Sequence, residues 1–247
     1  MTIFVTGTDT NIGKTFVTAL LVGCLSSKYN KIAVVKPIES GVVKSSKSDL
    51  NSIKKILKKK SDKVDFYNFV TFKQPVAPFT ASLINKKPID FNMIVKNINH
   101  LKGKYDLVVI EGAGGLKVPI TKKLQMIDLI KKIKADVILV TSPSLGTINH
   151  TLLSYEALKR MKIKFRGIII NNYPKKPNIS EIYNPIIISQ NNVKILGLVP
   201  RFSSSDSKKS KINYKNFFDP SLNGTFNLKN FLQTCNLKFS KISNKVS

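Results

Sequence analysis

The sequence predicts an α/β fold in which helices cover both faces of a mostly parallel sheet. Short, nearly continuous apolar runs recur along the 247 residues, as expected of strands that are buried on both faces. Segments with apolar residues at helical spacing lie between these runs. A glycine-rich loop joins the first strand to the first helix. In such folds ligands bind beyond the carboxyl ends of the strands, so we expect the functional residues there.

The N-terminal half alternates predicted strands with predicted helices. The strands are expected at 3–5, 31–36 and 105–110, and the helices at 16–25, 50–57 and 89–101. Asp49 lies near the start of the second of these helices. Residues 37–41 and 75–78 contain proline and are expected to be loops, while 66–72 is a mixed aromatic stretch.

The C-terminal half continues the alternation and then changes character. Strands are expected at 136–141, 165–170 and 194–199, and a helix at 151–161. Beyond Phe202 the chain is rich in serine, lysine and asparagine. Residues 227–237 suit a short closing helix, and the last ten residues suit a frayed end. We expect a main domain over 1–202 and an extension, 203–247, that belongs to it or is partly frayed.

The formal net charge of +27 is large enough to suggest a surface that binds nucleic acid. The basic residues are nearly all lysine, whereas phosphate-clamping surfaces usually employ the arginine fork. The lysines are spread along the chain beside many isoleucines and asparagines, and all three residue types have AT-rich codons. A biased genome therefore explains the charge better than a functional surface, and we expect no nucleic-acid partner.

Location and redox state follow from what the sequence contains. No apolar run approaches the length of a membrane span, and the N-terminus enters a strand without a basic leader or an apolar signal core. We expect a cytoplasmic protein with no membrane partner. Cys24 and Cys235 are too few for a disulfide framework and too far apart for a zinc-ligand pair. Both are interpreted as free thiols, with Cys24 on the buried face of the first helix.

The segment 7–15 (GTDTNIGKT) has the features of a phosphate-binding loop, because it follows a strand and ends in Gly-Lys-Thr where a helix begins. In such a loop backbone N–H groups and the positive helix end face an anion. Lys14 reaches the outer phosphates and the Thr15 hydroxyl binds Mg²⁺. Gly7 and Gly13 enclose five residues rather than the usual four, and a solvated turn with a helix cap is the alternative. We favour a P-loop NTPase-like site for a nucleoside triphosphate.

A second acidic group follows the predicted strand at 105–110. Glu111 stands where this buried strand opens into the glycines of 112–115. In phosphate-loop enzymes an acidic residue at the end of a neighbouring strand holds Mg²⁺ or its water. The alternative is an acidic turn residue, but an unpaired carboxylate at a buried strand end is costly. We therefore interpret Glu111 as part of a magnesium site.

Four segments, in the same order, resemble the dethiobiotin synthase family: 7–15 (GTDTNIGKT), 36–41 (KPIESG), 111–115 (EGAGG) and 145–150 (LGTINH). The resemblance covers about residues 1–202, which is most of the chain, and the five-residue spacing in the loop is the form that this family has. It implies a homodimeric ATP- and Mg²⁺-dependent ligase of biotin biosynthesis. CO₂ would add to one amine of 7,8-diaminopelargonic acid as a carbamate, which would attack the γ-phosphate of ATP. The second amine would then close the mixed anhydride into the cyclic urea of dethiobiotin.

The resemblance also implies roles for individual residues. Lys36 corresponds to the catalytic lysine, Lys14 is a second cation between carbamate and triphosphate, and Thr10 is expected near the carbamate. The magnesium site would consist of Thr15, Asp49 and Glu111. Nucleotide contacts are expected from Asn11, Ile12, Gly13, Lys14, Thr15, Phe16, Asp49, Glu111, Gly112, Ala113, Gly114, Asn171, Asn172, Pro200, Arg201 and Phe202. Substrate contacts are expected from Ser40 and, across the dimer interface, from Gly146, Thr147, Ile148 and Asn149.

Two departures and two rival classes accompany this interpretation. Asn11 stands where members of the family often have an acidic residue, and the tail after Phe202 matches poorly. A partitioning or cell-division ATPase that binds DNA or membrane would have a signature lysine at the position of Asp9, so its absence counts against that class. A non-catalytic nucleotide-binding domain of the same fold is the other rival. Lys36, Asp49 and Glu111 together favour retained chemistry.

Overall fold

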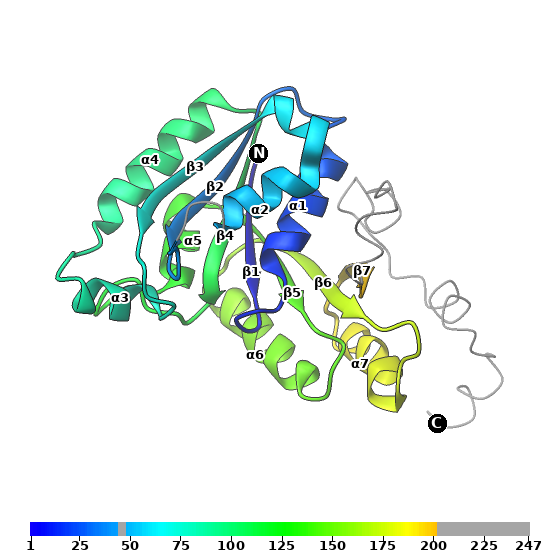
Figure 1. Cartoon of the computed structure of the whole chain (residues 1–247). Coiled ribbons are helices and arrows are strands. Elements are labelled where there is room, and N and C mark those ends of the chain that lie inside the picture. The colour runs from blue at the N-terminus through cyan, green and yellow to red at the C-terminus, as the bar shows by residue number, and fades with distance from the viewer. Residues whose placement is uncertain (44–47, 202–247) are drawn as a thin grey trace.

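A computed structural model describes residues 1–43 and 48–201, and in this part of the chain the strands form one seven-stranded sheet (Figure 1). From one edge to the other the strands are β3 (Val64–Thr71), β2 (Ile32–Glu39), β4 (Leu107–Gly115), β1 (Thr2–Gly7), β5 (Asp136–Thr141), β6 (Phe165–Tyr173) and β7 (Ile195–Pro200). Each pair of neighbouring strands is parallel, which confirms the predicted α/β class.

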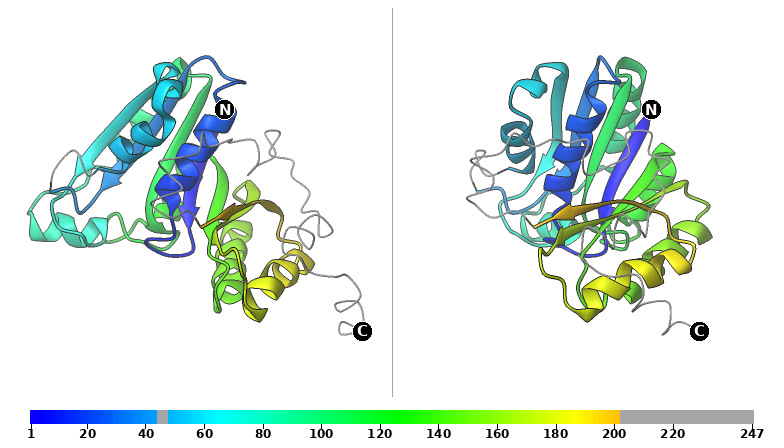
Figure 2. Two further views of the ribbon diagram at one scale, coloured as in Figure 1. Left: turned by 45° about the vertical axis from the view of Figure 1, so that its right-hand side comes forward. Right: turned by 90° about the vertical axis from the view of Figure 1, so that its right-hand side faces the viewer.

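Helices cover the two faces of this sheet. In chain order they are α1 (Lys14–Leu25), α2 (Asp49–Leu57), the 3₁₀ helix η2 (Lys58–Lys63), α3 (Pro78–Ile84), α4 (Phe91–Lys104), α5 (Met126–Ile133), α6 (Thr147–Arg160) and α7 (Ile179–Gln190). Residues of α1 and α2 pack in one cluster with the sheet, and residues of α4 and α5 pack in a second. The yellow α7 and the orange β7 lie at the side of the molecule opposite the cyan β3 (Figures 1 and 2).

The strands divide their side chains between the two faces because successive residues of a strand point in opposite directions. On β1, Ile3 and Val5 pack with the α1–α2 cluster, whereas Phe4 packs with the α4–α5 cluster. A third cluster joins β5, β6 and β7 to α7, with α6 packed against it. Burying one large apolar side chain, such as isoleucine or phenylalanine, contributes roughly 1.5–3 kcal/mol to the stability of the fold. Burial on both faces of the sheet therefore explains the apolar runs.

The end of β2 differs from the prediction. The strand continues through Pro37 to Glu39, so a loop at Pro37 is wrong. β4 pairs with β2 over Ile32–Val35, and beyond this point β3 is the neighbour that continues the pairing. A proline has no backbone N–H to donate, so a strand tolerates it at a position where the strand on one side does not pair.

Several element limits also differ. α1 begins at Lys14 and α6 at Thr147, in both cases after a glycine with positive φ. Both helices start earlier than predicted, because their first turns lack the apolar pattern that marks a helix in the sequence. The mixed stretch 66–72 lies largely in β3, an edge strand whose residues are mostly half-buried or exposed. Pro78 does not continue a loop but starts α3. α5 and α7 were not predicted.

Two further predictions concern the cysteines and the membrane. Cys24 is a buried cysteine of α1 that is not in a disulfide, as expected. Within the described ranges, none of the helices has the length and apolar character that crossing a membrane requires. The predictions for Phe202, Cys235, the helix at 227–237 and the extension 203–247 fall outside the described residues.

Candidate active site

The loop between β1 and α1 has the shape that a phosphate requires. Gly13 caps α1 in the left-handed region (φ 89°), and no side chain caps this helix end by a hydrogen bond. A Cβ at Gly13 would lie 2.0 Å from Nδ2 of Asn171, so glycine is needed both for the conformation and for the close approach. Asn171 is the last residue of a buried run in β6 and donates from Nδ2 to the carbonyl of Ile12 at 2.9 Å. The helix end is therefore fixed in position and open to an anion.

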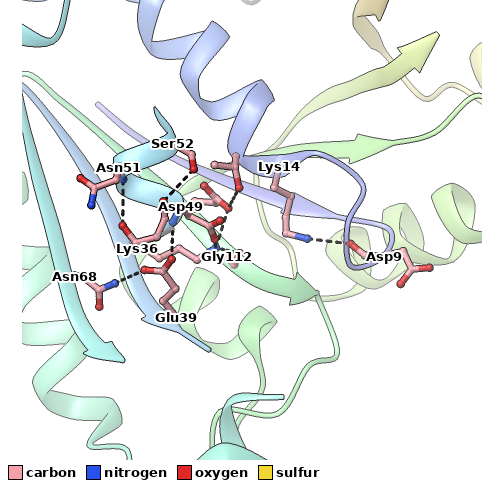
Figure 3. Close-up of polar contacts among 12 residues, drawn as sticks. Asp9, Lys14, Lys36, Glu39, Asp49, Asn51, Ser52, Asn68 and Gly112 are labelled. Carbon is pink, nitrogen blue, oxygen red and sulfur yellow. Dashed lines mark hydrogen bonds and ion pairs between the residues drawn. The ribbon is translucent and has the colours of Figure 1, made fainter. Parts of the chain in front are cut away.

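Lys14, the first residue of α1, is largely buried beside this loop. Its Nζ donates to the backbone carbonyl of Asp9 at 2.9 Å (Figure 3). Burial, followed by the nearby Lys36 ammonium, lowers the pKa of Lys14 to about 8. An anion placed between the two lysines would remove the repulsion, so this ammonium is prepared to bind a phosphate.

Lys36, in the second half of β2, lies at the centre of the site (Figure 3). Its Nζ is 2.6 Å from Oδ2 of Asp49, the first residue of α2. It is 2.8 Å from Oε1 of Glu111 on β4, and it donates to the carbonyl of Gly112 at 3.3 Å. The ammonium of Lys36 and the carboxylates of Asp49 and Glu111 thus meet at one point, although they come from three elements, β2, α2 and β4.

The charges of these groups follow from their surroundings. Burial alone would lower the pKa of Lys36, but the Glu111 and Asp49 carboxylates outweigh it and raise that pKa. Burial acts to raise the pKa of Asp49, yet the Lys36 ammonium prevails and lowers it. Burial raises the pKa of Glu111, while Lys36 opposes the rise. Two acidic side chains therefore face one ammonium that stays charged.

The oxygens around Lys36 fit a magnesium ion. The Thr15 hydroxyl donates to Oε1 of Glu111 at 2.9 Å. Oε2 of Glu111 is buried and finds no hydrogen-bond partner within the described residues, which is costly for a carboxylate unless a cation binds there. In the same ranges no cluster of three or more His, Cys, Asp or Glu side chains forms a complete metal cage. Mg²⁺ typically binds through one or two carboxylates and completes its shell with water and substrate phosphates.

These groups share one polar cavity of about 450 Å³. It brings together most of the residues expected at the catalytic, phosphate and metal positions. The lining comprises Thr10, Asn11, Gly13, Lys14, Thr15, Lys36, Glu39, Ser40, Asp49, Glu111, Ala113 and Gly114. The cavity lies at the carboxyl ends of β1, β2 and β4, where the fold predicts a ligand.

Comparison with known proteins decides the family. A family model described as "AAA domain" matches residues 1–209. The ATP-dependent dethiobiotin synthetase BioD of Thermodesulfovibrio yellowstonii is 38% identical, over 83% of this chain and 91% of its own length. The protein of the same name from Bacillus velezensis is 35% identical, over 83% of this chain and 88% of its own. The chain belongs to the dethiobiotin synthetase family. This confirms the resemblance found in the four sequence segments.

Solved structures with the same fold are more distant. The cell division ATPase MinD of Pyrococcus furiosus has a TM-score of 0.55 and 17% identity, covering 95% of this chain and 96% of that one. MinD of Pyrococcus horikoshii, complexed with Mg-ADP, has a TM-score of 0.52 and 21% identity, covering 82% of each chain. At these identities the likeness shows the P-loop fold alone.

The remaining residues expected at the site of a dethiobiotin synthetase are not among those that line the cavity. Gly112 packs against the core, because a Cβ there would lie 2.7 Å from the Phe4 ring, and its carbonyl accepts from Lys36. Asn171 and Asn172 lie just before Tyr173, the last residue of β6, and Pro200 ends β7. The backbone N–H of Arg201 donates to the Tyr173 carbonyl at 2.8 Å, which holds the two strand ends together. Phe16 packs partly buried against the α1–α2 cluster.

The segment 146–149 is divided between surface and interior. Gly146 and Asn149 are exposed at the start of α6. Thr147 is buried, and its hydroxyl shares a 2.6 Å hydrogen bond with that of Thr141. Ile148 packs partly buried against the third cluster. Within one chain, the exposed residues of this segment are the ones free to contact a ligand, and their role as substrate contacts stays a prediction.

Sequence reasoning missed Glu39 and Asn68. Strict alternation along β2 would place Glu39 on the face opposite Lys36. Instead, Val35 and Ile38 both pack in the α4–α5 cluster, so the alternation breaks at Pro37. Lys36 and Glu39 therefore line the same cavity. The proline between the two charged residues was the signal that could have shown this.

Proposed function

We propose that this chain catalyses the ATP-dependent conversion of 7,8-diaminopelargonic acid and CO₂ to dethiobiotin. The observation that carries the proposal is the position of Lys36. In this member of the family, Lys36 lies beside Asp49 and Glu111, in the same cavity as the phosphate-binding loop. The reaction brings two anions together, a carbamate and a triphosphate, and cations must lie between them. Lys14 and Lys36 both line the cavity and supply that charge.

The reaction would proceed in three steps. CO₂ adds to one amine of the substrate and gives a carbamate. A carbamate oxygen then attacks the γ-phosphorus, and the bond to the β–γ bridging oxygen breaks as ADP leaves. The second amine finally attacks the carbamoyl carbon, inorganic phosphate departs, and the cyclic urea forms. Thr10 and Ser40 line the cavity and would contact the carbamate and the substrate.

Two lysines would change partners during these steps. Lys14 would leave the Asp9 carbonyl for the outer phosphates. An ammonium has three N–H donors, and those of Lys36 already face Asp49, Glu111 and the Gly112 carbonyl. Lys36 must therefore release at least one of them to bind the carbamate or the γ-phosphate. Thr15, Asp49 and Glu111 would hold Mg²⁺, which when bound neutralises phosphate charge.

The nucleotide base would lie near the ends of β6 and β7. Oδ1 of Asn171 is buried and lacks a hydrogen-bond partner within the described residues, although Nδ2 of the same amide is bonded to the Ile12 carbonyl. A free acceptor at this position suits the amino group of adenine. This supports Asn171, with Asn172, Pro200 and Arg201 nearby, as adenine contacts.

The enzyme would be a homodimer in which Gly146 and Asn149 of one subunit contact the substrate of the other. Two large apolar side chains near these residues in the sequence are exposed in the single chain. Leu145 is 86% exposed and Leu153 is 58% exposed. An apolar patch beside exposed polar residues is typical of a surface that another subunit covers. This supports the dimer that the family resemblance implies.

The test is incubation with 7,8-diaminopelargonic acid, bicarbonate, Mg²⁺ and ATP. Mass spectrometry should find the cyclic urea, and an ADP assay should show about one ADP per urea, because one γ-phosphate is transferred in each turnover. Lys36→Ala should abolish urea formation and leave ATP binding largely intact. Absence of the urea with the unaltered protein would refute the proposed activity, and unchanged turnover by the variant would remove Lys36 from the mechanism.

A further inference from the structure

Glu39 is a buried acid in the active-site cavity that the proposed reaction does not use. It lies at the carboxyl end of β2 and is 3% exposed. A buried carboxylate is costly unless hydrogen bonds satisfy its oxygens. Oε1 accepts from the backbone N–H of Asp49 at 2.6 Å, and Oε2 accepts from Nδ2 of Asn68 at 2.6 Å. Figure 3 shows Glu39 between Asn68 and the start of α2.

The bond to Asp49 serves the end of α2. The first backbone N–H groups of a helix have no partner within it, and a negative charge near them is favourable. Ser48 caps this helix, but its hydroxyl accepts from Asn51 and not from Asp49. Glu39 therefore supplies from the sheet the acceptor for the N–H of Asp49.

This contact also fixes where the Asp49 side chain points. The rest of α2 is held against α1 by Ile53 and Leu57, which belong to the same core cluster. The backbone of Asp49 is held separately, by the Glu39 carboxylate, and its side chain meets Lys36 at 2.6 Å. Asn68, on the neighbouring strand β3, holds the other oxygen of Glu39 and so orients the carboxylate.

We propose that Glu39, oriented by Asn68, is a positioning residue that places Asp49 to receive the metal–nucleotide complex. The proposal rests on the proposed function of Asp49 as a magnesium ligand. Glu39 would act through Asp49 and would not touch the reacting atoms. Partners that orient a metal ligand in this way commonly change metal affinity by about 10- to 100-fold when they are removed.

The test exchanges the two partners. Asn68→Asp sets a carboxylate against Glu39 and should break the contact, whereas the double variant Glu39→Gln with Asn68→Asp restores an amide–carboxylate pair in reversed order. ATP affinity is measured by calorimetry with Mg²⁺ and with EDTA, in the absence of the diamine. The ratio of the two affinities is the magnesium-dependent gain, and Asn99→Asp on α4, at an exposed position, controls for the added charge.

We expect Asn68→Asp to reduce the gain about tenfold or more, with little change of affinity in EDTA, and the double variant to recover most of it. An undiminished gain in Asn68→Asp, or a double variant as weak as the single one, would overturn the proposal. Circular dichroism checks folding. If Asn68→Asp does not fold, Glu39→Ala replaces it, with the same loss expected and a retained gain as the contrary result.

This outcome is separable from that of the proposed function. If the unaltered protein makes no cyclic urea, the proposed activity fails, yet the magnesium-dependent gain can still be compared among the variants. If the exchange shows no effect while the unaltered protein makes the urea, the positioning role fails and the activity stands.

Discussion

Lys36 stabilises the protein as well as serving the proposed reaction. Its ammonium is the cation nearest to Glu111, whose side chain is 1% exposed. Removing one partner of a buried ion pair leaves the other charge without compensation and costs about 3–5 kcal/mol. We predict that Lys36→Met, which keeps the length of the side chain, lowers the free energy of unfolding by about 3 kcal/mol at pH 7. Urea denaturation in EDTA measures the change.

The same variant tests whether the lysine and the metal compete. Lys36 contacts the two carboxylates that the proposed metal would use. Lys36→Met should therefore gain more stability from added Mg²⁺ than the unaltered protein gains, since the emptied position attracts a cation. The matched control is Lys102→Met, because Lys102 donates to a backbone carbonyl on α5 far from the site. An equal effect of Mg²⁺ on all three proteins would contradict competition.

Lys14 should make nucleotide binding depend on pH. In the protein alone its pKa is lowered to about 8, chiefly by burial, and phosphates beside it would raise that pKa. Above pH 8 binding would then require the uptake of a proton. We predict that ATP affinity in EDTA, measured by calorimetry, falls by up to about tenfold for each pH unit from 8 towards 10.

A permanent charge at this position provides the control. Lys14→Arg keeps a cation that does not titrate in this range, so its affinity, although lower, should change little with pH. The free energy of unfolding depends on pH with the opposite sign. The unfolded chain binds more protons than the folded one between the lowered and the ordinary pKa of Lys14, so this group makes the free energy of unfolding rise with pH there. An affinity that stays level from pH 8 to 10 in the unaltered protein would contradict the lowered pKa.

Among the elements, the start of α6 is held by hydroxyl groups and an amide. The Thr141 hydroxyl at the end of β5 lies 2.6 Å from that of Thr147 and 3.1 Å from that of Thr151. Thr8, in the phosphate-binding loop, also donates to Thr141, at 3.3 Å. Asn184 on α7 donates to the carbonyls of Pro143 and Ser144, at 2.7 and 3.1 Å. These contacts connect the nucleotide loop to the segment expected to reach the other subunit.

We predict that Thr141→Val lowers the free energy of unfolding by about 1–3 kcal/mol, because it keeps the shape and leaves buried hydroxyls without their partner. Urea denaturation measures the loss. Thr141→Ser keeps the hydroxyl and serves as the control, with the smaller loss expected from removing one methyl group. If valine is tolerated better than serine, packing and not hydrogen bonding holds the start of α6.

The elements also show which features a sequence can predict. Strands β1, β4 and β5 are buried on both faces, and their continuous apolar runs made them predictable from the sequence. The edge strand β3 is largely half-buried, so neither an apolar run nor a clean alternation marked it. Glu39 was missed because side-chain direction after Pro37 depends on pairing with β3, a contact between distant parts of the chain. The phosphate-binding loop was predictable because a local pattern of glycines determines it.

At the scale of the whole molecule, the fold does not distinguish a synthetase from a cell division ATPase. MinD of Pyrococcus furiosus shares the fold at 17% identity. The difference lies in side chains at the carboxyl ends of the strands. Asp9 stands where the cell-division class would have a second lysine, and its carbonyl receives Lys14. Among the described residues, the cations that line the cavity are Lys14 and Lys36, which the fold brings together from α1 and β2.

The proposed dimer can be tested by mixing two inactive variants. Lys36→Met should disable the cavity of its own subunit, and Asn149→Ala should disable the contact that its subunit gives to the partner. In a mixed dimer one site carries both defects and the other carries neither. Equal mixing after dissociation should give half mixed dimers, so turnover should recover to about one quarter of that of the unaltered enzyme.

The recovery discriminates between two arrangements of the site. If Asn149 served the cavity of its own chain, each site would keep one defect and mixing would restore nothing. Asn149 is exposed at the start of α6, beside Leu145 and near Leu153, and the proposed shared site would make use of that exposure. Sedimentation of the mixture confirms that dimers have formed again. A mixture that re-forms dimers without regaining turnover would therefore exclude a substrate contact across the interface, while leaving the chemistry at Lys36 untouched.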